Sequence, residues 1–539
     1  LMPAGIQSVQ LGVFAVLFLG VAVIGIFAGR WRRAASMDNL EEWGLGGRSF
    51  GGIITWFLLG GDLYTAYTFI AVPALVYGAG QIGFFAVPYT IVMYPFAFVV
   101  MPRLWSVCYR HRYVTPADFV GGRYGSKLLA LVIAVTGIAA IVPYVALQLF
   151  GIRVIFEAMG LGTTSLGTNF PLVLAAVILA LYTFNAGLRS PALTALLKDT
   201  LIYVVVIVAV IYIPIKLGGF GSIFHAAKAG LAHKPKAAFI TPKGMYSPYA
   251  TLALGSALAL FMYPHNITGV LAAKSRNTIR RNMAALPAYT LMLGFIALFG
   301  YMAIAKGIHV SDNNLALPRL FQAVFPNWFV GIAFAAIGIG ALVPAAIMAI
   351  SAANLFSLNI WKAYIKKDAS PRFETWLAKV VAVLLAGAAL VFIVAIKSTF
   401  IINFQLLGGM WILQTFPAIV FGLYTRWFHR WALVAGWAAG IGTGTAMAAA
   451  NAFKSSIYAV HIGALHFSAF AGLIALVVNV LVLLILNPLL KLARVPDGHD
   501  ETTRDDYEAE RDVAEPAADQ GDPRERRIAP TPHQPSGSP

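Results

Sequence analysis

The sequence predicts an all-α polytopic membrane protein, and composition and charge placement carry that prediction. Of the 539 residues, 59% are hydrophobic and only 11% are charged, whereas soluble proteins carry about 25% charged residues. The acidic residues are also unevenly placed, because twelve of the 22 lie in 496–539 and only ten in 1–495. We therefore expect 1–495 to be embedded in the membrane, and 496–539 to be a disordered acidic tail that cannot bury enough apolar surface to fold.

About thirteen apolar runs are long enough to cross a bilayer, whose hydrocarbon core of about 30 Å needs ~20 apolar residues per helix. These runs lie near 8–29, 50–78, 82–102, 128–150, 169–187, 192–215, 248–272, 283–305, 327–352, 376–396, 401–423, 432–452 and 465–489. The first run lacks a preceding basic segment and is followed by many others. We therefore expect it to be a retained span rather than a cleaved signal peptide.

Basic residues follow every odd-numbered span. The clusters include Arg30, Arg32, Arg33, Arg103, Arg110, Arg112, Arg123, Lys127, Lys274, Arg276, Arg280, Arg281, Lys362, Lys366, Lys367, Arg426, Arg430, Lys491 and Arg494. Lys and Arg are enriched in cytoplasmic loops, so the pattern predicts an inner-membrane protein with its N-terminus outside and its C-terminus in the cytoplasm. The loop between the sixth and seventh spans also carries Lys228, Lys234, Lys236 and Lys243, but long loops translocate with little regard to charge. Basic residues confined to such loops do not indicate nucleic acid as a partner.

The second span is interrupted by Gly60-Gly61-Asp62-Leu63-Tyr64-Thr65. A charged group at membrane depth costs at least ~2.5–3.5 kcal/mol, so intramembrane acids usually mark function. Two glycines beside an acid favour an unwound stretch whose carbonyls and hydroxyls line a cavity and bind an ion or a polar solute. The alternative is a helix interface with small residues for packing and a protonated Asp62 bonded to a neighbour.

The seventh span contains a second interruption, Met262-Tyr263-Pro264-His265-Asn266. Proline removes a backbone hydrogen bond and excludes its ring from the preceding turn, while the His and Asn side chains need polar partners. A simple proline kink with a satisfied core histidine is the alternative.

The two interrupted spans open two groups of five spans each. Because five is odd, the groups have opposite orientations, and discontinuous helices at matching positions of inverted repeats indicate a substrate site near the bilayer midplane. Helix N-termini there favour an anionic solute. The expected organisation is a first span and basic turn at 1–33, repeats at 34–247 and 248–430, peripheral spans at 431–495 and the tail at 496–539.

Asp199 is the second acid inside an apolar run, near the expected cytoplasmic end of the sixth span. Neighbouring helical residues project about 100° apart, so Lys198 and Asp199 need not pair. Asp199 is either a cation or proton site or an interfacial charge that anchors the helix. No P-loop, HExxH or GxSxG motif is present in the sequence, and we expect neither an enzyme nor a bound cofactor.

Several short motifs resemble the sodium:solute symporter family. They are Gly46-Gly-Arg-Ser-Phe50, Tyr182-Thr-Phe-Asn-Ala-Gly-Leu-Arg189 with Lys198-Asp199, Tyr263-Pro-His265 with Ala272-Ala-Lys274, and Asn359-Ile-Trp361. The resemblance covers roughly 40–490 and implies a five-plus-five inverted-repeat (LeuT-like) core. The sequences around Gly60 and Tyr263 most resemble those of bacterial monocarboxylate (pyruvate, lactate, alanine) permeases.

The resemblance also implies a sodium site between carbonyls of the first broken helix and two adjacent hydroxyl residues in the ninth span. Anchoring on Asn359-Ile-Trp361 puts Val343 and Pro344 at those positions. Neither side chain offers an oxygen, and hard cations need oxygen ligands. We therefore expect proton coupling in preference to sodium, with Asp62 or Asp199 carrying the proton. The family's acid beside an additional sodium aligns with Asp199, and Gly60 and Leu63 complete the coupling segment.

The expected function is import of a short-chain monocarboxylate (pyruvate, lactate, alanine or acetate) with a co-transported H⁺ or Na⁺ by alternating access. The candidate substrate contacts come from both breaks and the surrounding spans: Gly61, Tyr64, Thr65, Tyr144, Gln148, Tyr263, His265, Asn266 and Gln405. The alternatives are a sodium-coupled symporter of an amino acid or sugar and, more remotely, a membrane sensor.

Overall fold

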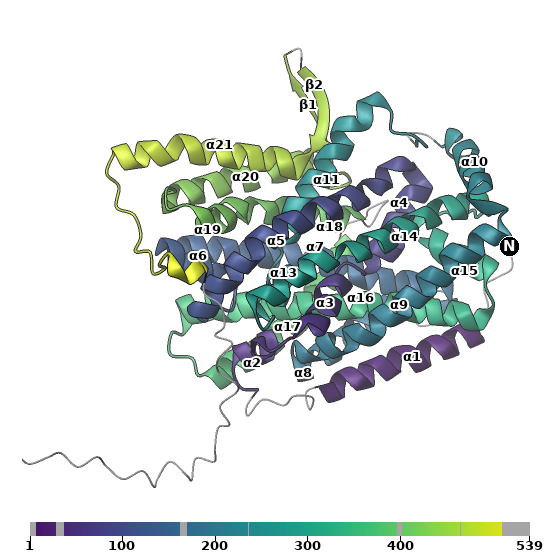
Figure 1. Ribbon diagram of the computed structural model, residues 1–539, viewed down its shortest axis with the longest axis horizontal. Coiled ribbons are helices and arrows are strands. Elements are labelled where there is room, and N and C mark those ends of the chain that lie inside the picture. Colours follow the sequence, from purple (N-terminus) through teal and green to yellow (C-terminus); the bar gives the residue numbers. More distant parts are fainter. Residues whose placement is uncertain are drawn as a thin grey trace, which may run out of the picture.

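The computed structural model describes residues 7–28, 37–161, 170–234, 237–395, 402–463 and 465–508. These residues form a bundle of long helices that run roughly parallel (Figure 1). Arg30, Arg32, Arg33, Lys236 and 509–539, which entered the predictions of orientation and tail, lie outside the described residues.

The first half of the chain supplies helices α1 to α10. Their bounds are α1 (Ser8–Phe27), α2 (Leu40–Leu45), α3 (Gly52–Gly61), α4 (Val72–Ala79), α5 (Ala86–Arg110), α6 (Pro116–Tyr124), α7 (Lys127–Ala158), α8 (Phe170–Ala186), α9 (Arg189–Lys216) and α10 (Gly219–Ala232). A π-helical turn, Tyr67–Ala71, precedes α4 directly. The second predicted span is therefore two short helices joined by an unwound stretch.

The second half supplies α11 to α21 and a hairpin. Their bounds are α11 (Tyr246–Leu260), α12 (Pro264–Leu271), α13 (Arg276–Ala285), α14 (Pro287–Ala305), α15 (Ala316–Val324), α16 (Asn327–Leu355), α17 (Pro371–Ala395), α18 (Ile402–Ile412), α19 (Gly422–Tyr424), α20 (Arg430–Ala450), β1 (Ile457–Ile462), β2 (Leu465–Phe470) and α21 (Ala471–Leu492). A bend of 47° separates α11 from α12 at Pro264. Both predicted helix breaks are confirmed.

The number of spans differs from the predicted thirteen. Among the described residues, ten helices are long and apolar enough to cross a membrane, or eleven if α11 and α12 form one bent span. The expected span at 50–78 is broken in the middle and gives two shorter apolar helices. The expected span at 169–187 also gives a shorter apolar helix among the described residues. The expected thirteenth span is also shorter, since 465–470 pairs with Ile457–Ile462 in an antiparallel hairpin that projects beyond the helices (Figure 1).

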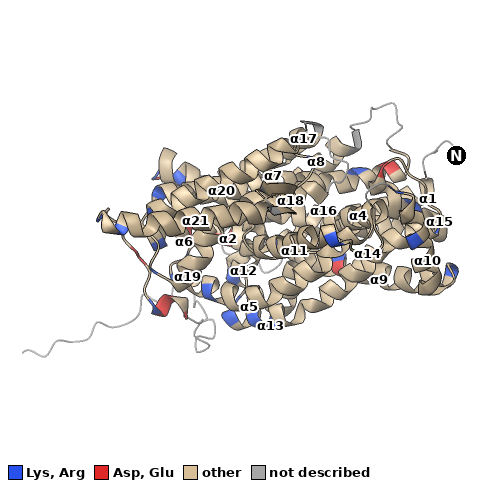
Figure 2. Cartoon of the chain, turned by 90° about the horizontal axis from the view of Figure 1, so that it is seen from above, with Lys and Arg blue, Asp and Glu red and all other residues tan. Residues whose placement is uncertain are grey.

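Helix α16 forms the centre of the bundle. It contacts α1, α7, α9 and α17, and 94% of the most apolar stretch of Asn327–Ile365 is buried. Outer helices instead present apolar side chains outward, as Val16 of α1 and Leu481 of α21 do with 74% and 53% exposure. Figure 2 shows Lys and Arg gathered at the helix ends and few charges in the middle. This distribution fits a bundle whose outer surface faces lipid.

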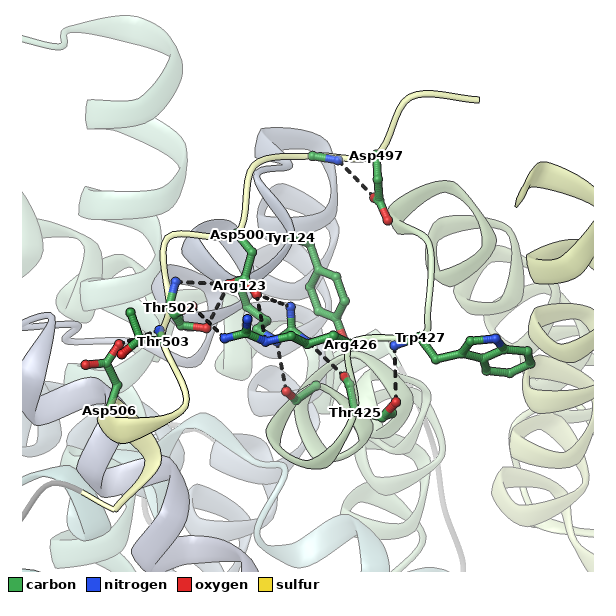
Figure 3. Close-up of polar contacts among 12 residues, drawn as sticks. Arg123, Tyr124, Thr425, Arg426, Trp427, Asp497, Asp500, Thr502, Thr503 and Asp506 are labelled. Carbon is green, nitrogen blue, oxygen red and sulfur yellow. Dashed lines mark hydrogen bonds and ion pairs between the residues drawn. The ribbon is translucent and has the colours of Figure 1, made fainter. Parts of the chain in front are cut away.

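The start of the acidic tail is ordered, contrary to the expectation of disorder from 496 onward. Figure 3 shows 497–506 lying across the ends of α6 and α19, with Arg123 and Arg426 between them. Asp500 accepts a hydrogen bond of 2.8 Å from Arg123, whose guanidinium also donates to the carbonyls of Gly422 and Thr425. This part of the tail is ordered because its carboxylates pair with basic residues at the helix ends. Its low content of apolar residues gave no sign of these contacts. We call the end of the bundle at α6, α13 and α19 the basic end.

Candidate functional site at the two helix breaks

The first break begins where α3 ends at Gly61 and covers 62–65. Two glycines are needed here because other helices approach the backbone closely. A Cβ atom on Gly60 would overlap the ring of Tyr289, and one on Gly61 would lie 2.6 Å from Asp199 Oδ2 and 2.7 Å from Lys198 Nζ. Gly60 and Gly61 therefore do more than favour unwinding. They also leave room for the side chains of Tyr289, Lys198 and Asp199.

Lys198 and Asp199 of α9 form an ion pair against this break. Their charged atoms lie 2.8 Å apart, and both side chains are 0% exposed. Lys198 Nζ also donates to the carbonyl of Gly61 and, at 3.4 Å, to that of Tyr64. Tyr289 of α14 donates a hydrogen bond of 3.0 Å to Asp199. The sequence left the pairing of Lys198 with Asp199 open, and the structure forms it, because the long lysine side chain reaches its neighbour.

The second break places Tyr263 and His265 beside the first. Asp62 Oδ2 lies 3.4 Å from His265 Nε2, and both side chains are at most 3% exposed. Tyr263 donates a hydrogen bond of 2.9 Å to the carbonyl of Gln405, and Asn266 Nδ2 donates one of 2.9 Å to the carbonyl of Leu260, at the end of α11. An acid and a histidine thus join the two broken helices.

The surrounding helices supply amide groups with spare hydrogen-bonding capacity. Gln148 of α7 accepts a hydrogen bond of 3.0 Å from the backbone of Ala66 through Oε1, and Tyr144 packs against the rings of Tyr263 and His265 at 5.3 and 5.4 Å. Within the described residues, several buried polar atoms around the breaks lack a hydrogen-bond partner: Asp62 Oδ1, Tyr67 Oη, Gln148 Nε2, His265 Nδ1 and Gln405 Oε1. Buried polar atoms left in this state favour a polar ligand between them.

The predicted site residues divide into two groups. Asp62, Tyr144, Gln148, Tyr263, His265 and Gln405 meet between the breaks. Tyr64 instead packs with Tyr203 and Tyr289, on the side of Lys198. Thr65 accepts a hydrogen bond of 3.0 Å from the backbone of Tyr67, and the carbonyl of Leu63 accepts one from Thr68.

Sequence reasoning missed the roles of Lys198, Tyr289 and Gly340. Lys198 carried a signal, because a lysine beside an acid in an apolar run needs a buried partner. Gly340 of α16 packs against the first break, since a Cβ atom there would lie 3.4 Å from the carbonyl oxygen of Tyr64. Val343 and Pro344 lie one turn further along the same buried helix.

Comparison with known families identifies this architecture. A model of the sodium:solute symporter family matches residues 43–440. The chain belongs to the sodium:solute symporter family. The resemblance of its motifs to that family is thereby confirmed.

Relatives and solved structures refine this assignment. The symporter is 50% identical to a monocarboxylate transport permease protein of Rhizobium johnstonii over 91% of this chain and 98% of that protein. It is 34% identical to an uncharacterized symporter, YodF, of Bacillus subtilis over 88% of this chain and 92% of that one. A Na⁺-coupled sialic acid symporter in a substrate-bound outward-open state has the same fold, with a TM-score of 0.70 and 16% identity, over 89% of this chain and 98% of that one. The LeuT-like fold of this symporter is thus shown.

The residues present do not fit the sodium site that the family implies. Counted back from Asn359-Ile-Trp361, its two hydroxyl positions fall on Val343 and Pro344. The carbonyls of Gly61 and Tyr64 already accept hydrogen bonds from Lys198. Neither Val343 nor Pro344 supplies a side-chain oxygen, which a hard cation requires.

Proposed function

We propose that this symporter imports short-chain monocarboxylates, such as pyruvate or lactate, together with a proton by alternating access. The observation that carries the proposal is the contact of Asp62 with His265, which places an ionisable pair between the two helix breaks with unpartnered amide atoms around it. The monocarboxylate permease relative, at 50% identity, supports the substrate class.

The substrate carboxylate would bind at the start of α12. No side chain caps this helix, and the first amides of a helix have no partner within it, so they bind anions well. Gln148 Nε2, a donor without a partner among the described residues, lies on a neighbouring helix. We assign Tyr144, Gln148, Tyr263, His265 and Gln405 to substrate contact. We assign Asn266 to bracing the second break, because its Nδ2 donates a hydrogen bond to the carbonyl of Leu260 in α11 and lies 3.3 Å from His265 Nε2.

Asp62 is the better candidate for the proton carrier. Asp199 is neutralised by Lys198 at 2.8 Å, whereas Asp62 faces a histidine and has one oxygen without a partner in the described chain. Protonation of Asp62 from the outside, followed by substrate binding and closure, would couple the two fluxes. We also propose the orientation expected from the loops, with the N-terminus outside and the C-terminus in the cytoplasm.

Labelled pyruvate uptake into proteoliposomes tests the proposal under an inward proton gradient alone and a sodium gradient alone. We expect concentrative uptake with protons alone, and its loss in Asp62→Asn. Asp368→Asn is the matched control, because Asp368 is exposed. Uptake that requires sodium would contradict proton coupling, and no uptake of any short monocarboxylate under either gradient would contradict the substrate class. Concentrative uptake of an amino acid or sugar would then establish the alternative.

A further inference from the structure

The surroundings of the Lys198 ammonium are those of a cation site. Two backbone carbonyls of the first break, those of Gly61 and Tyr64, accept hydrogen bonds from Nζ. The Asp199 carboxylate lies 2.8 Å away, and the lysine side chain is 0% exposed. Carbonyl and carboxylate oxygens are the ligands that hard cations take in proteins. The amine therefore stands where a small cation would find three oxygen ligands.

The opposite wall of this position comes from α16. Gly340 brings the backbone of α16 against the carbonyl oxygen of Tyr64. Beyond it, Val343 is 1% exposed and Pro344 is buried, so α16 supplies apolar side chains. An ammonium needs acceptors in only a few directions, since it has three hydrogens and one carbon substituent. The apolar wall is thus compatible with the lysine and unsuited to a free cation.

The backbone of the first break is built around this amine. At Gly61 a Cβ atom would lie 2.7 Å from Nζ and 2.6 Å from Asp199 Oδ2. Only glycine lets the carbonyl of the last turn of α3 and the ion pair of α9 approach this closely. The position of the Lys198 ammonium is therefore fixed by Gly61 on α3 and by the ion pair with Asp199 on α9.

We propose that the Lys198 ammonium is a tethered cation that replaces a free sodium ion at the first break and holds α3 against α9. This inference deepens the proposed function, since a fixed internal charge removes the need for sodium at this site. Its chemical consequence is specific. Shortening Lys198 to alanine leaves two carbonyls, the Asp199 carboxylate and a vacated volume, which together form a site for a small monovalent cation.

Sodium binding by the purified full-length protein tests this inference, with no substrate present. In Lys198→Ala we expect saturable binding of radioactive Na⁺. We also expect the melting temperature to rise by roughly 1–2 °C when NaCl replaces choline chloride at about ten times Kd. The wild type should show neither effect. Lys198→Met fills the same volume without charge and should bind no sodium, and Lys198→Ala combined with Asp199→Asn should lose the sodium effect.

The wild-type measurement keeps the inference testable even if the alanine variant is unstable. Saturable sodium binding by the wild type would overturn it, as would a folded Lys198→Ala protein that binds no sodium. Lys228→Ala on the exposed surface of α10 is the control for loss of a lysine. A failure of the proposed substrate class or of proton coupling would appear only in the uptake assay, because these measurements contain neither a carboxylate substrate nor a gradient.

Discussion

At the scale of single residues, the contact between Asp62 and His265 connects the two halves of the site. Asp62 follows Gly61 in the unwound stretch after α3, and His265 follows Pro264 in the first turn of α12. Asp62 Oδ2 and His265 Nε2 lie 3.4 Å apart although the two residues are far apart in the chain. A proton on either side chain changes the hydrogen bonding of both breaks together, which is what a coupled transporter requires.

Gly61 gives a sharp prediction at this scale. In Gly61→Ala the new methyl group would meet Lys198 Nζ and Asp199, and overpacking of this kind costs about 1–3 kcal/mol. We expect a lower melting temperature and loss of uptake. Gly52→Ala is the matched control on the same helix, because a Cβ atom there meets nothing within 4 Å. Equal stability and uptake in the two variants would show that α3 and α9 approach less closely.

At the scale of elements, the sequence predicted much of the fold and less of the site. Both helix breaks could be predicted, because glycine and proline act locally on the backbone. The pairing of Lys198 with Asp199 could not, since it depends on how α9 packs against α3. The hairpin Ile457–Phe470 was assigned in part to the last span, because an apolar run does not distinguish a strand from the start of a helix.

Asn266 tests whether the second break is braced at the end of α11. Asn266→Leu removes the hydrogen bond from Nδ2 to the carbonyl of Leu260. This carbonyl keeps the hydrogen bond of 3.3 Å from the backbone N–H of Tyr263, so the loss costs about 0.5–1.5 kcal/mol. We expect a lower melting temperature with a KM for uptake within about twofold of the wild type. A KM raised tenfold or more at unchanged stability would instead assign Asn266 to substrate contact.

At the scale of the whole molecule, the ordered start of the tail connects the two halves of the chain at the basic end. The tail contacts His111, directly after α5, and Arg123 of α6, both in the first half. It contacts Arg276 of α13 and Arg426 beside α19 in the second half. Alternating access requires movement between such halves. Because the docked tail contacts both halves, we expect it to restrain that movement.

The docking of the tail should depend on pH through Asp506. Burial alone would raise the pKa of this carboxyl, but hydrogen bonds from Thr503 and His111 outweigh it and hold the pKa below its ordinary value of 3.8. Arg110, 3.8 Å away, adds positive charge. A lowered pKa stabilises the docked state above the ordinary value, and that stabilisation is lost as the pH falls through the lower folded-state value.

We therefore expect the Asp506 contacts to persist from pH 7 to 5 and to weaken only below about pH 4. Hydrogen exchange of 497–508, corrected for the intrinsic rate at each pH, measures this dependence. Loss of protection already between pH 7 and 5 would contradict the role of Asp506.

Removal of the docked segment gives the prediction for the molecule as a whole. A chain that ends at Val495 loses the charged hydrogen bond of Asp500 with Arg123, 2.8 Å long, among others. Such bonds contribute about 1.5–3 kcal/mol each, so opening of the basic end should become at least about tenfold more frequent.

The buried Cys108 of α5, the single cysteine of the chain, reports this opening. We expect a maleimide to label it correspondingly faster than in a chain that ends at Glu508 and keeps every docked residue. Equal labelling rates in the two chains would mean that the tail rests on the basic end without restraining it.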